Sequence, residues 1–197
     1  MKQKNLIAAL FTIVGIISTN AQASVFYEGF DGDYYNVGRW TIDRDPFESD
    51  AAIDLSNAPI SIELISGNNA IDEDNPFESR IDFSIKAAAS GIVSFDWSYI
   101  TYDSFEEPIW DPFGYIIDGV FYSLSADDGL STQSGSVSFD ILAGQIFGFR
   151  QIATDSLFGS AHSTISNFSA PVPLPGALVL FGIALASLNV FRRNRAE

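Results

Sequence analysis

Polar and apolar residues alternate along most of the middle of the chain. Between positions 93 and 99 every odd residue is apolar and every even residue is polar. A strict period of two predicts a β-strand with one apolar face, because successive side chains of a strand point to opposite sides. We expect this face to pack in the core; it carries Val93, Phe95, Trp97 and Tyr99.

Further short segments are rich in β-branched or aromatic residues: 25–30, 60–65, 79–85, 134–141, 146–152 and 163–168. Turn-forming residues, such as Asp127, Asp128 and Gly129, lie between them. Short strands separated by polar turns predict an all-β fold, and we expect an antiparallel, jelly-roll-like β-sandwich of about eight to ten strands. Short helical turns are expected at 51–57 and 86–90.

The first 23 residues predict a secretory signal peptide. Lys2 and Lys4 precede an apolar stretch at 6–17, and Ala21 and Ala23 form an A-x-A cleavage site. We favour cleavage after Ala23 over a retained membrane anchor, because the apolar stretch is short and ends in polar residues. The mature chain would then begin at Ser24.

The last segment, 171–197, predicts a single hydrophobic helix at the C-terminus. Its entry contains three prolines, which favour an extended backbone. Residues 176–191 carry no charge, and a basic cluster follows them: Arg192, Arg193 and Arg195. At ~1.5 Å per residue this helix is roughly 24 Å long, and snorkelling arginines can help it span the ~30 Å hydrocarbon core. We favour a transmembrane helix with a cytoplasmic basic end over a short buried core helix.

The order of these features resembles the PEP-CTERM sorting signal of Gram-negative bacteria. The motif is the VPLPGA variant, with Leu174 where the family has Glu, and consists of Val172, Pro173, Leu174, Pro175, Gly176 and Ala177. The resemblance implies processing by an inner-membrane exosortase, a transient anchor, and a final location at the cell surface or outside the cell. Segments 95–99, 110–115, 144–149 and 165–171 are also similar to the bodies of PEP-CTERM proteins, which implies a fold and no catalytic residues.

Between the two sorting segments, residues 24–170 form one strongly acidic domain. Five basic residues face twenty-four Asp and Glu, so its net charge is −19, compared with −15 for the whole chain. Such a surface repels nucleic acid and anionic lipid, and we expect no nucleic-acid partner. It is compatible with cations, with neutral glycans or simply with solubility. The chain has no cysteine, which excludes disulfides and a thiol nucleophile.

Clusters of acidic residues in the predicted loops raise the question of a calcium site. Calcium takes six to eight oxygen ligands, but no cluster in this chain has the spacing of an EF-hand loop. Our candidate site joins Glu28 and Asp31, near the start of the sandwich, to Asp155 from a late strand. We favour the alternative, in which the acidic loops are solvated and bind no ion.

Several aromatic residues in the predicted loops lie close to acidic residues. Aromatic faces beside carboxylates can stack on a sugar ring and hydrogen-bond its hydroxyls. Trp110 and Tyr115 are therefore candidate glycan contacts. For Trp110 we favour the alternative that it packs beneath an Asp-capped turn at 111–114.

Catalysis has little support in the sequence, and we predict no catalytic residue. His162, the only histidine, is expected in the turn before the last strand, and no Gly-x-Ser-x-Gly motif accompanies it. A single histidine also excludes a multi-histidine zinc site. Among so many carboxylates, no particular pair stands out for glycoside hydrolysis.

Taken together, these patterns predict an exported, non-enzymatic surface or extracellular-matrix protein that is processed by an exosortase and associated with exopolysaccharide. Two alternatives stay open. One is a secreted carbohydrate-binding module with structural calcium, and the less favoured one is a glycan-active hydrolase.

Overall fold

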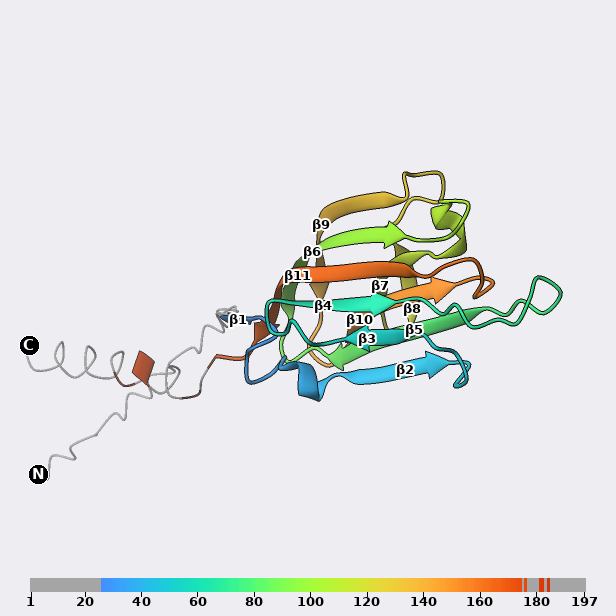
Figure 1. Cartoon of the computed structure of the whole chain (residues 1–197). Helices are drawn as coiled ribbons and strands as arrows, with labels where there is room; N and C mark the ends of the chain where they lie inside the picture. Colours follow the sequence, from blue (N-terminus) through green and yellow to red (C-terminus); the bar gives the residue numbers. More distant parts are fainter. Residues whose placement is uncertain (1–25, 175, 177–180, 183, 185–197) are drawn as a thin grey trace, which may run out of the picture.

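Two antiparallel sheets pack face to face to form a jelly-roll-like β-sandwich (Figure 1). The computed structural model describes residues 26–174, 176, 181, 182 and 184. One sheet has the strand order β3-β4-β11-β6-β9, with β1 paired to β11, and the other has the order β2-β5-β10-β7-β8. The predicted fold class is confirmed.

The strands are β1 (Phe26–Glu28), β2 (Thr41–Asp45), β3 (Ala52–Asp54), β4 (Ser61–Ile65), β5 (Ser79–Lys86), β6 (Gly91–Thr101), β7 (Phe113–Ile117), β8 (Val120–Ser123), β9 (Thr132–Ile141), β10 (Ile146–Ala153) and β11 (Ala161–Val172). Two short 3₁₀ helices accompany them, η1 (Val37–Arg39) and η2 (Pro108–Trp110).

The predicted alternation of the central strand is observed in β6. The four apolar residues at its odd positions, 93–99, are buried, whereas the polar residues between them are partly or fully exposed. Strand β10 turns Phe147, Phe149 and Gln151 inward, and all three are buried. The amide of Gln151 is satisfied there, because its Nε2 donates to the Asp111 carbonyl at 2.9 Å and its Oε1 accepts from Ser163 Oγ at 2.6 Å.

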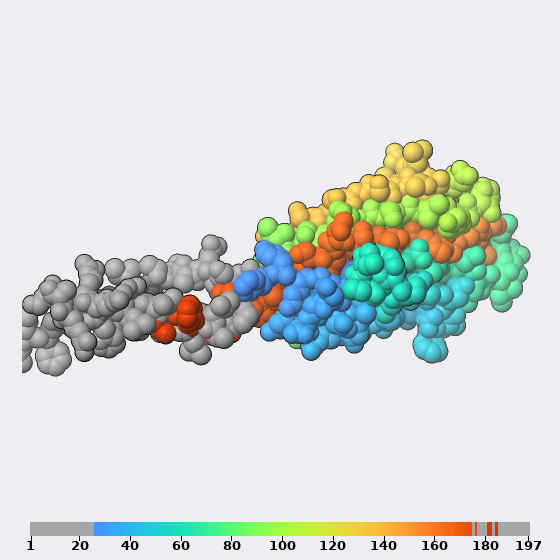
Figure 2. All heavy atoms as spheres, turned by 60° about the vertical axis from the view of Figure 1, so that its left-hand side comes forward, coloured from blue at the N-terminus to red at the C-terminus, as the bar shows by residue number. Residues whose placement is uncertain are grey.

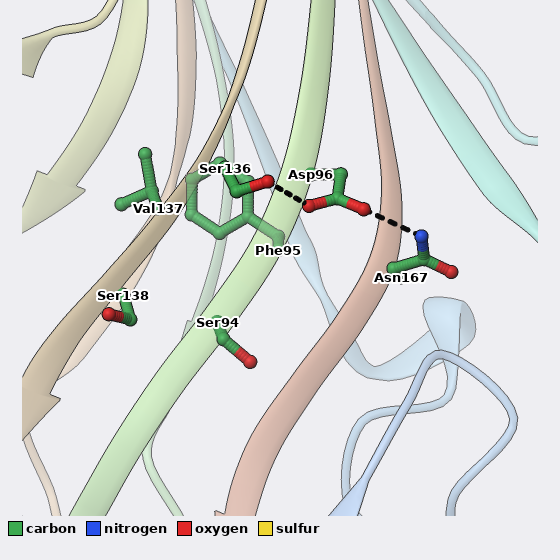
Figure 3. Close-up of a pocket in the computed structure, with 7 residues that line it drawn as sticks. All are labelled: Ser94, Phe95, Asp96, Ser136, Val137, Ser138 and Asn167. Atoms are coloured by element: carbon green, nitrogen blue, oxygen red, sulfur yellow. Dashed lines mark hydrogen bonds between the residues drawn. The ribbon is translucent and has the colours of Figure 1, made fainter.

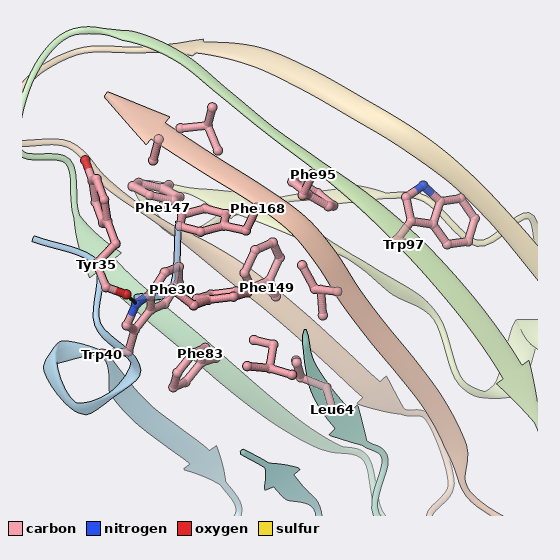
Figure 4. Close-up of a cluster of buried hydrophobic side chains, with 14 of the residues drawn as sticks. Phe30, Tyr35, Trp40, Leu64, Phe83, Phe95, Trp97, Phe147, Phe149 and Phe168 are labelled. Carbon is pink, nitrogen blue, oxygen red and sulfur yellow. Dashed lines mark hydrogen bonds between the residues drawn. The ribbon is translucent and has the colours of Figure 1, made fainter. Parts of the chain in front are cut away.

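The core between the sheets is largely aromatic (Figure 4). The Trp40 indole is stacked on Phe83, with ring centroids 4.6 Å apart and planes 8° apart. A second nearly parallel ring, Phe149, lies 5.7 Å away at 13°. The rings of Phe147 and Phe168 meet the indole edge-on. These contacts join residues from β5, β10 and β11, so the stack holds both sheets together.

Tyr35 connects the beginning of the domain to its end. Its hydroxyl donates to the Pro171 carbonyl at 2.7 Å and accepts from the Ala88 amide at 3.0 Å. Its own carbonyl accepts from Trp40 Nε1 at 2.9 Å. Burial raises the pKa of Tyr35, so the hydroxyl keeps the proton that it donates.

The two ends of the sandwich differ: one holds the chain ends of the domain, and the other holds its longer connections. Residues 26–28 of β1 pair with residues 170–172 at the end of β11, so the chain enters and leaves the domain at the same end (Figures 1 and 2). We call this end the terminal pole. The connections 46–51, 66–78, 102–112, 124–131 and 154–160 lie at the opposite end, which we call the distal pole.

Several local predictions were wrong. The described residues form eleven strands instead of about eight to ten, and β2, β3, β7 and β8 were not predicted. Segment 51–57 contains strand β3 instead of a helical turn, and the described short helices are η1 and η2 instead of 86–90. The predicted turn at 111–114 contains the start of β7, where Phe113 is fully buried.

The predicted signal peptide lies outside the described residues, and so does most of the C-terminal sorting segment. Of the predicted C-terminal helix, residues 176, 181, 182 and 184 are described and are helical. Among the described residues, no helix has the length and apolar character needed to cross a bilayer.

Candidate functional site

A hollow of about 300 Å³ at the distal pole combines aromatic rings with carboxylates. We call it the distal hollow; its lining consists of Phe105, Glu107, Trp110, Asp155 and Phe158. The three rings are 64%, 39% and 36% exposed, in chain order, although the fold buries many of its other aromatic side chains. Phe105 and Phe158 meet edge to face, with centroids 5.5 Å apart.

Trp110 is held at both its backbone and its ring. Its carbonyl accepts from the Thr154 amide at 2.7 Å and from Thr154 Oγ1 at 3.0 Å. Its Nε1 donates to Glu107 Oε2 at 3.0 Å. Trp110 is the last residue of helix η2, which begins with Pro108, a residue with the backbone φ that a first helical position needs. The indole plane and the Glu107 carboxylate therefore have a defined relative orientation.

Left-handed backbone conformations surround the distal hollow. Glu106, Ser156 and Phe158 have φ values of 57°, 54° and 63°, and such conformations cost on the order of 1–3 kcal/mol each for non-glycine residues. The Phe158 carbonyl is held by Ser104, whose amide and hydroxyl donate to it at 3.0 and 3.1 Å. The next residue is Gly159, with φ 137°. A Cβ at this position would lie 2.1 Å from the Tyr102 carbonyl oxygen, so the position requires glycine. These contacts fix the conformation of the loops without a bound ligand.

A buried acidic layer lies behind the hollow. Asp111, the residue after Trp110, accepts from Ser66 Oγ at 2.7 Å and from Thr101 Oγ1 at 3.2 Å. Burial, assisted by the charges of Asp103 and Asp155, raises the pKa of Asp111 to about 7 although both hydrogen bonds oppose this shift. A protonated carboxyl removes one negative charge from the interior.

Asp103 is the second buried acid of this layer. Its Oδ1 accepts from the Phe105 amide at 2.7 Å, whereas its Oδ2 is buried without a hydrogen-bond partner among the described residues. Burial raises the pKa of Asp103, and the charges of Asp155 and Glu107 raise it further. The distal pole therefore has a negative potential that an anionic ligand would have to overcome.

The structure does not bring together the three carboxylates of the candidate calcium site. Glu28 pairs with Ala170 at the terminal pole, and Asp31 follows closely in the chain. Asp155 precedes the other end of β11 and lines the distal hollow. The nine residue steps along β11 from Ala161 to Ala170 span about 30 Å. Within the described ranges no group of three or more His, Cys, Asp or Glu is placed to hold a metal ion.

Of the two candidate glycan contacts, only Trp110 lines the distal hollow. Tyr115 belongs to β7 and is stacked between Tyr122 and Phe139, with ring centroids 4.9 and 4.6 Å away. Its ring also packs against the core near Phe95. Tyr115 is therefore a packing residue at the edge of the sandwich.

His162 lies within β11, and the prediction of a turn at this position was wrong. Its Nδ1 is 3.3 Å from Glu63 Oε1 on the neighbouring strand β4. Its ring meets Tyr102 edge-on at 5.2 Å. These contacts fit a cross-strand pair on the outer face of the sheet.

A second hollow, of about 260 Å³, lies on the outer face of the sheet that contains β6 (Figure 3). Asp96 accepts there from Asn167 Nδ2 at 2.6 Å and from Ser136 Oγ. These hydrogen bonds, with that from Asn167 first, lower the pKa of Asp96. Asn167 has φ 48° at a β-bulge in β11, which turns its side chain towards Asp96. The polar groups satisfy one another, and none of the lining residues is an exposed aromatic.

Of the residues that line the distal hollow, Phe105, Glu107 and Phe158 were not among the predicted site residues. Trp110, Phe105 and Glu107 stand close together in the sequence beside other aromatic and acidic residues, whereas Phe158 stands alone after Leu157 in a turn-rich segment. Its role depends on the β10–β11 connection folding back onto the 102–112 connection, which no local pattern reveals.

Comparisons with known proteins give only distant structural similarities. No protein-family model matches the sequence, and no curated protein matches it. Among solved structures, a family 35 carbohydrate-binding module from Clostridium thermocellum is similar at 12% identity and a TM-score of 0.33, over 73% of this chain and 98% of that one. The structure of TmCBM61 in complex with β-1,4-galactotriose is similar at 12% identity and a TM-score of 0.37, over 74% of this chain and 94% of that one.

The K1 cleaved adhesin domain of Lys-gingipain from Porphyromonas gingivalis W83 is similar at 9% identity and a TM-score of 0.41, over 77% of this chain and 99% of that one. TM-scores this low do not support a common function.

The buried acid Asp111 predicts that stability depends on pH. Its pKa is raised in the folded state to about 7, whereas an unfolded chain gives about 3.9. The folded state therefore binds an extra proton between these values, and its stability falls as pH rises through this window. Asp111→Asn should make the free energy of unfolding, measured with urea across this range, fall less steeply with pH. The control Asp128→Asn removes an exposed charge and should keep the parent slope; an unchanged slope in Asp111→Asn would contradict the prediction.

Proposed function

We propose that this protein is a non-catalytic carbohydrate-binding module whose distal hollow takes a neutral sugar residue of an extracellular polysaccharide. The observation that supports the proposal is the convergence of three partly exposed rings and two carboxylates on one hollow of about 300 Å³. The rings can cover the apolar face of a sugar ring, and the carboxylates can accept hydrogen bonds from its hydroxyls.

The charges at the distal pole narrow the class of ligand. Glu107 and Asp155 line the hollow, and the chain carries an excess of acidic residues, with a net charge of −15. Like-charge juxtaposition disfavours polysaccharides built of uronic acids. A neutral glycan meets no such repulsion and gains charge-assisted hydrogen bonds to the carboxylates.

Export and processing form the second part of the proposal. It rests on the sequence patterns at 1–23 and 171–197 and on their resemblance to exosortase substrates. Because both ends of the domain leave from the terminal pole, an anchored protein would direct its distal hollow away from the membrane. Cleavage near 173–177 would release the domain into the extracellular matrix, where it would associate with exopolysaccharide.

Binding is tested by electrophoresis in gels that contain a neutral polysaccharide: β-glucan, galactan, mannan or xylan. We expect at least one of them to retard the protein, and polygalacturonate to have no such effect. Trp110→Ala should raise the dissociation constant about tenfold or more, since aromatic stacking contributes about 0.5–1.5 kcal/mol beyond the area that it buries.

The matched control is Phe47→Ala, which truncates a ring that is 85% exposed and lies outside the hollow. This variant should bind like the parent. Equal affinity of Trp110→Ala and the parent would rule out the distal hollow, and binding by none of the four polysaccharides would contradict the carbohydrate proposal. Release of shorter oligosaccharides from the polysaccharide during incubation would show that the protein is a hydrolase and contradict the non-catalytic proposal.

The processing proposal predicts the intact mass of the protein recovered from its native host. The mature chain should begin at Ser24 and end between Pro173 and Ala177, with any added mass located at the new C-terminus. Recovery of a chain that still carries residues 178–197 would contradict cleavage and leave a membrane-anchored domain.

A further inference from the structure

Strand β9 is an exposed edge of the sandwich. It is ten residues long and pairs with β6 on one side only, and no other described strand pairs with it (Figure 1). The other terminal strands of the two sheets are shorter: β3 has three residues, β2 five and β8 four. In an edge strand, alternate residues direct their backbone N–H and C=O groups away from the sheet.

This edge lacks the features that usually prevent strands of different molecules from pairing. Natural edge strands carry lysines, prolines, bulges or inward-pointing charges. Between Asp128 and Asp140 the chain has no charged residue and no proline. The ten residue pairs between β6 and β9 run without a register shift from Gly91–Ile141 to Ile100–Thr132. In a chain with a net charge of −15, this uncharged strip is where two copies can approach with the least repulsion.

Apolar side chains continue the strip towards the other sheet. Val137 and Phe139 of β9 are only partly buried, and both pack against the core. Phe139 begins a stack of three rings that passes through Tyr115 to Tyr122. Tyr122 lies on β8, the edge strand of the opposite sheet, and is 43% exposed. A strand added beside β9 would cover apolar surface as well as satisfy backbone groups.

We propose that β9 is a self-association surface, at which β9 of a second copy pairs antiparallel with it about a two-fold axis at Ser136. Ile141 is buried, so the segment open to a partner is 132–140, and Ser136 is its centre. The axis places Ser134 opposite Ser138 of the other copy and Gly135 opposite Val137. Asp140 then faces Thr132, so no two carboxylates are opposed.

Antiparallel pairing has a consequence for the whole assembly. Since β9 runs from the distal pole to the terminal pole, a copy rotated about this axis has its poles reversed. The chain ends of the two copies then leave the dimer in opposite directions, and each distal hollow lies on the side of the other copy's chain ends. Such a dimer joins two surfaces or two released molecules, and it is independent of what the hollow binds.

The absence of cysteine from the chain makes disulfide crosslinking a direct test. The full chain carrying Ser136→Cys, in mild detergent, is oxidised with copper phenanthroline and analysed on a non-reducing gel. Directly opposed residues of an antiparallel pair have Cα atoms about 4.5–5.5 Å apart, within the range that a disulfide spans. We expect a crosslinked dimer several-fold above the level seen with Ser56→Cys, an exposed control position away from β9. Equal crosslinking of the two variants, or none, would overturn the proposal.

Two charge variants in the Ser136→Cys background separate specific pairing from random collision. Ser134→Glu with Ser138→Glu opposes like charges twice across the axis and should lower the crosslinked fraction several-fold. Ser134→Lys with Ser138→Glu opposes unlike charges at the same positions and should retain the dimer. Both positions are exposed, so unchanged thermal midpoints verify that the variants fold. Equal crosslinking of the two charge variants would contradict the register.

Discussion

The Trp40 indole, packed against Phe83 and Phe149 in nearly parallel planes, is the contact on which the sandwich depends most. The chain has no cysteine, so cohesion between the sheets has to come from buried side chains. Tyr35 extends this contact to the chain ends, because it bonds to Trp40 through its carbonyl and to Pro171 through its hydroxyl. The same interactions that fill the core thus hold the first and last strands together at the terminal pole.

Because these stabilising contacts lie in the core and at the terminal pole, the distal pole can contain features that lower stability. There the chain accommodates left-handed backbone at Glu106, Ser156 and Phe158, a buried acid with a raised pKa at Asp111, and three partly exposed rings. Each of these costs stability, and their concentration around one hollow is what distinguishes it from the polar hollow at Asp96. Asp96 and its neighbours, in contrast, form hydrogen bonds with one another, and the left-handed residue among them is Asn167, a residue type that tolerates this conformation.

Sequence patterns predicted the strands that have one buried face and one solvent-exposed face. In β6 the alternation at 93–99 matches the observed burial, because one face of this strand packs in the core and the other faces solvent. Strand β2, with the sequence TIDRD, escaped prediction because it is an edge strand whose residues are all exposed, Ile42 included. Nor could local patterns show that Asp155 and Glu28 belong to opposite poles, since this depends on how β1 pairs with the far end of β11. Tyr115 was assigned to a loop because β7 is short and follows the Trp110 turn directly.

The central claim is that the distal hollow binds a neutral glycan, and the three tryptophans of the chain provide a direct measurement with internal controls. Each indole N–H gives its own signal in a ¹H–¹⁵N correlation spectrum. Trp40 is buried with its N–H bonded to Tyr35, Trp97 is buried in the core, and Trp110 donates to Glu107 in the hollow. On titration with oligosaccharides cut from the neutral polysaccharide that retards the protein, the Trp110 signal should move while those of Trp40 and Trp97 stay in place. A Trp110 signal that does not move while the sugar binds would place the binding site elsewhere and contradict the account.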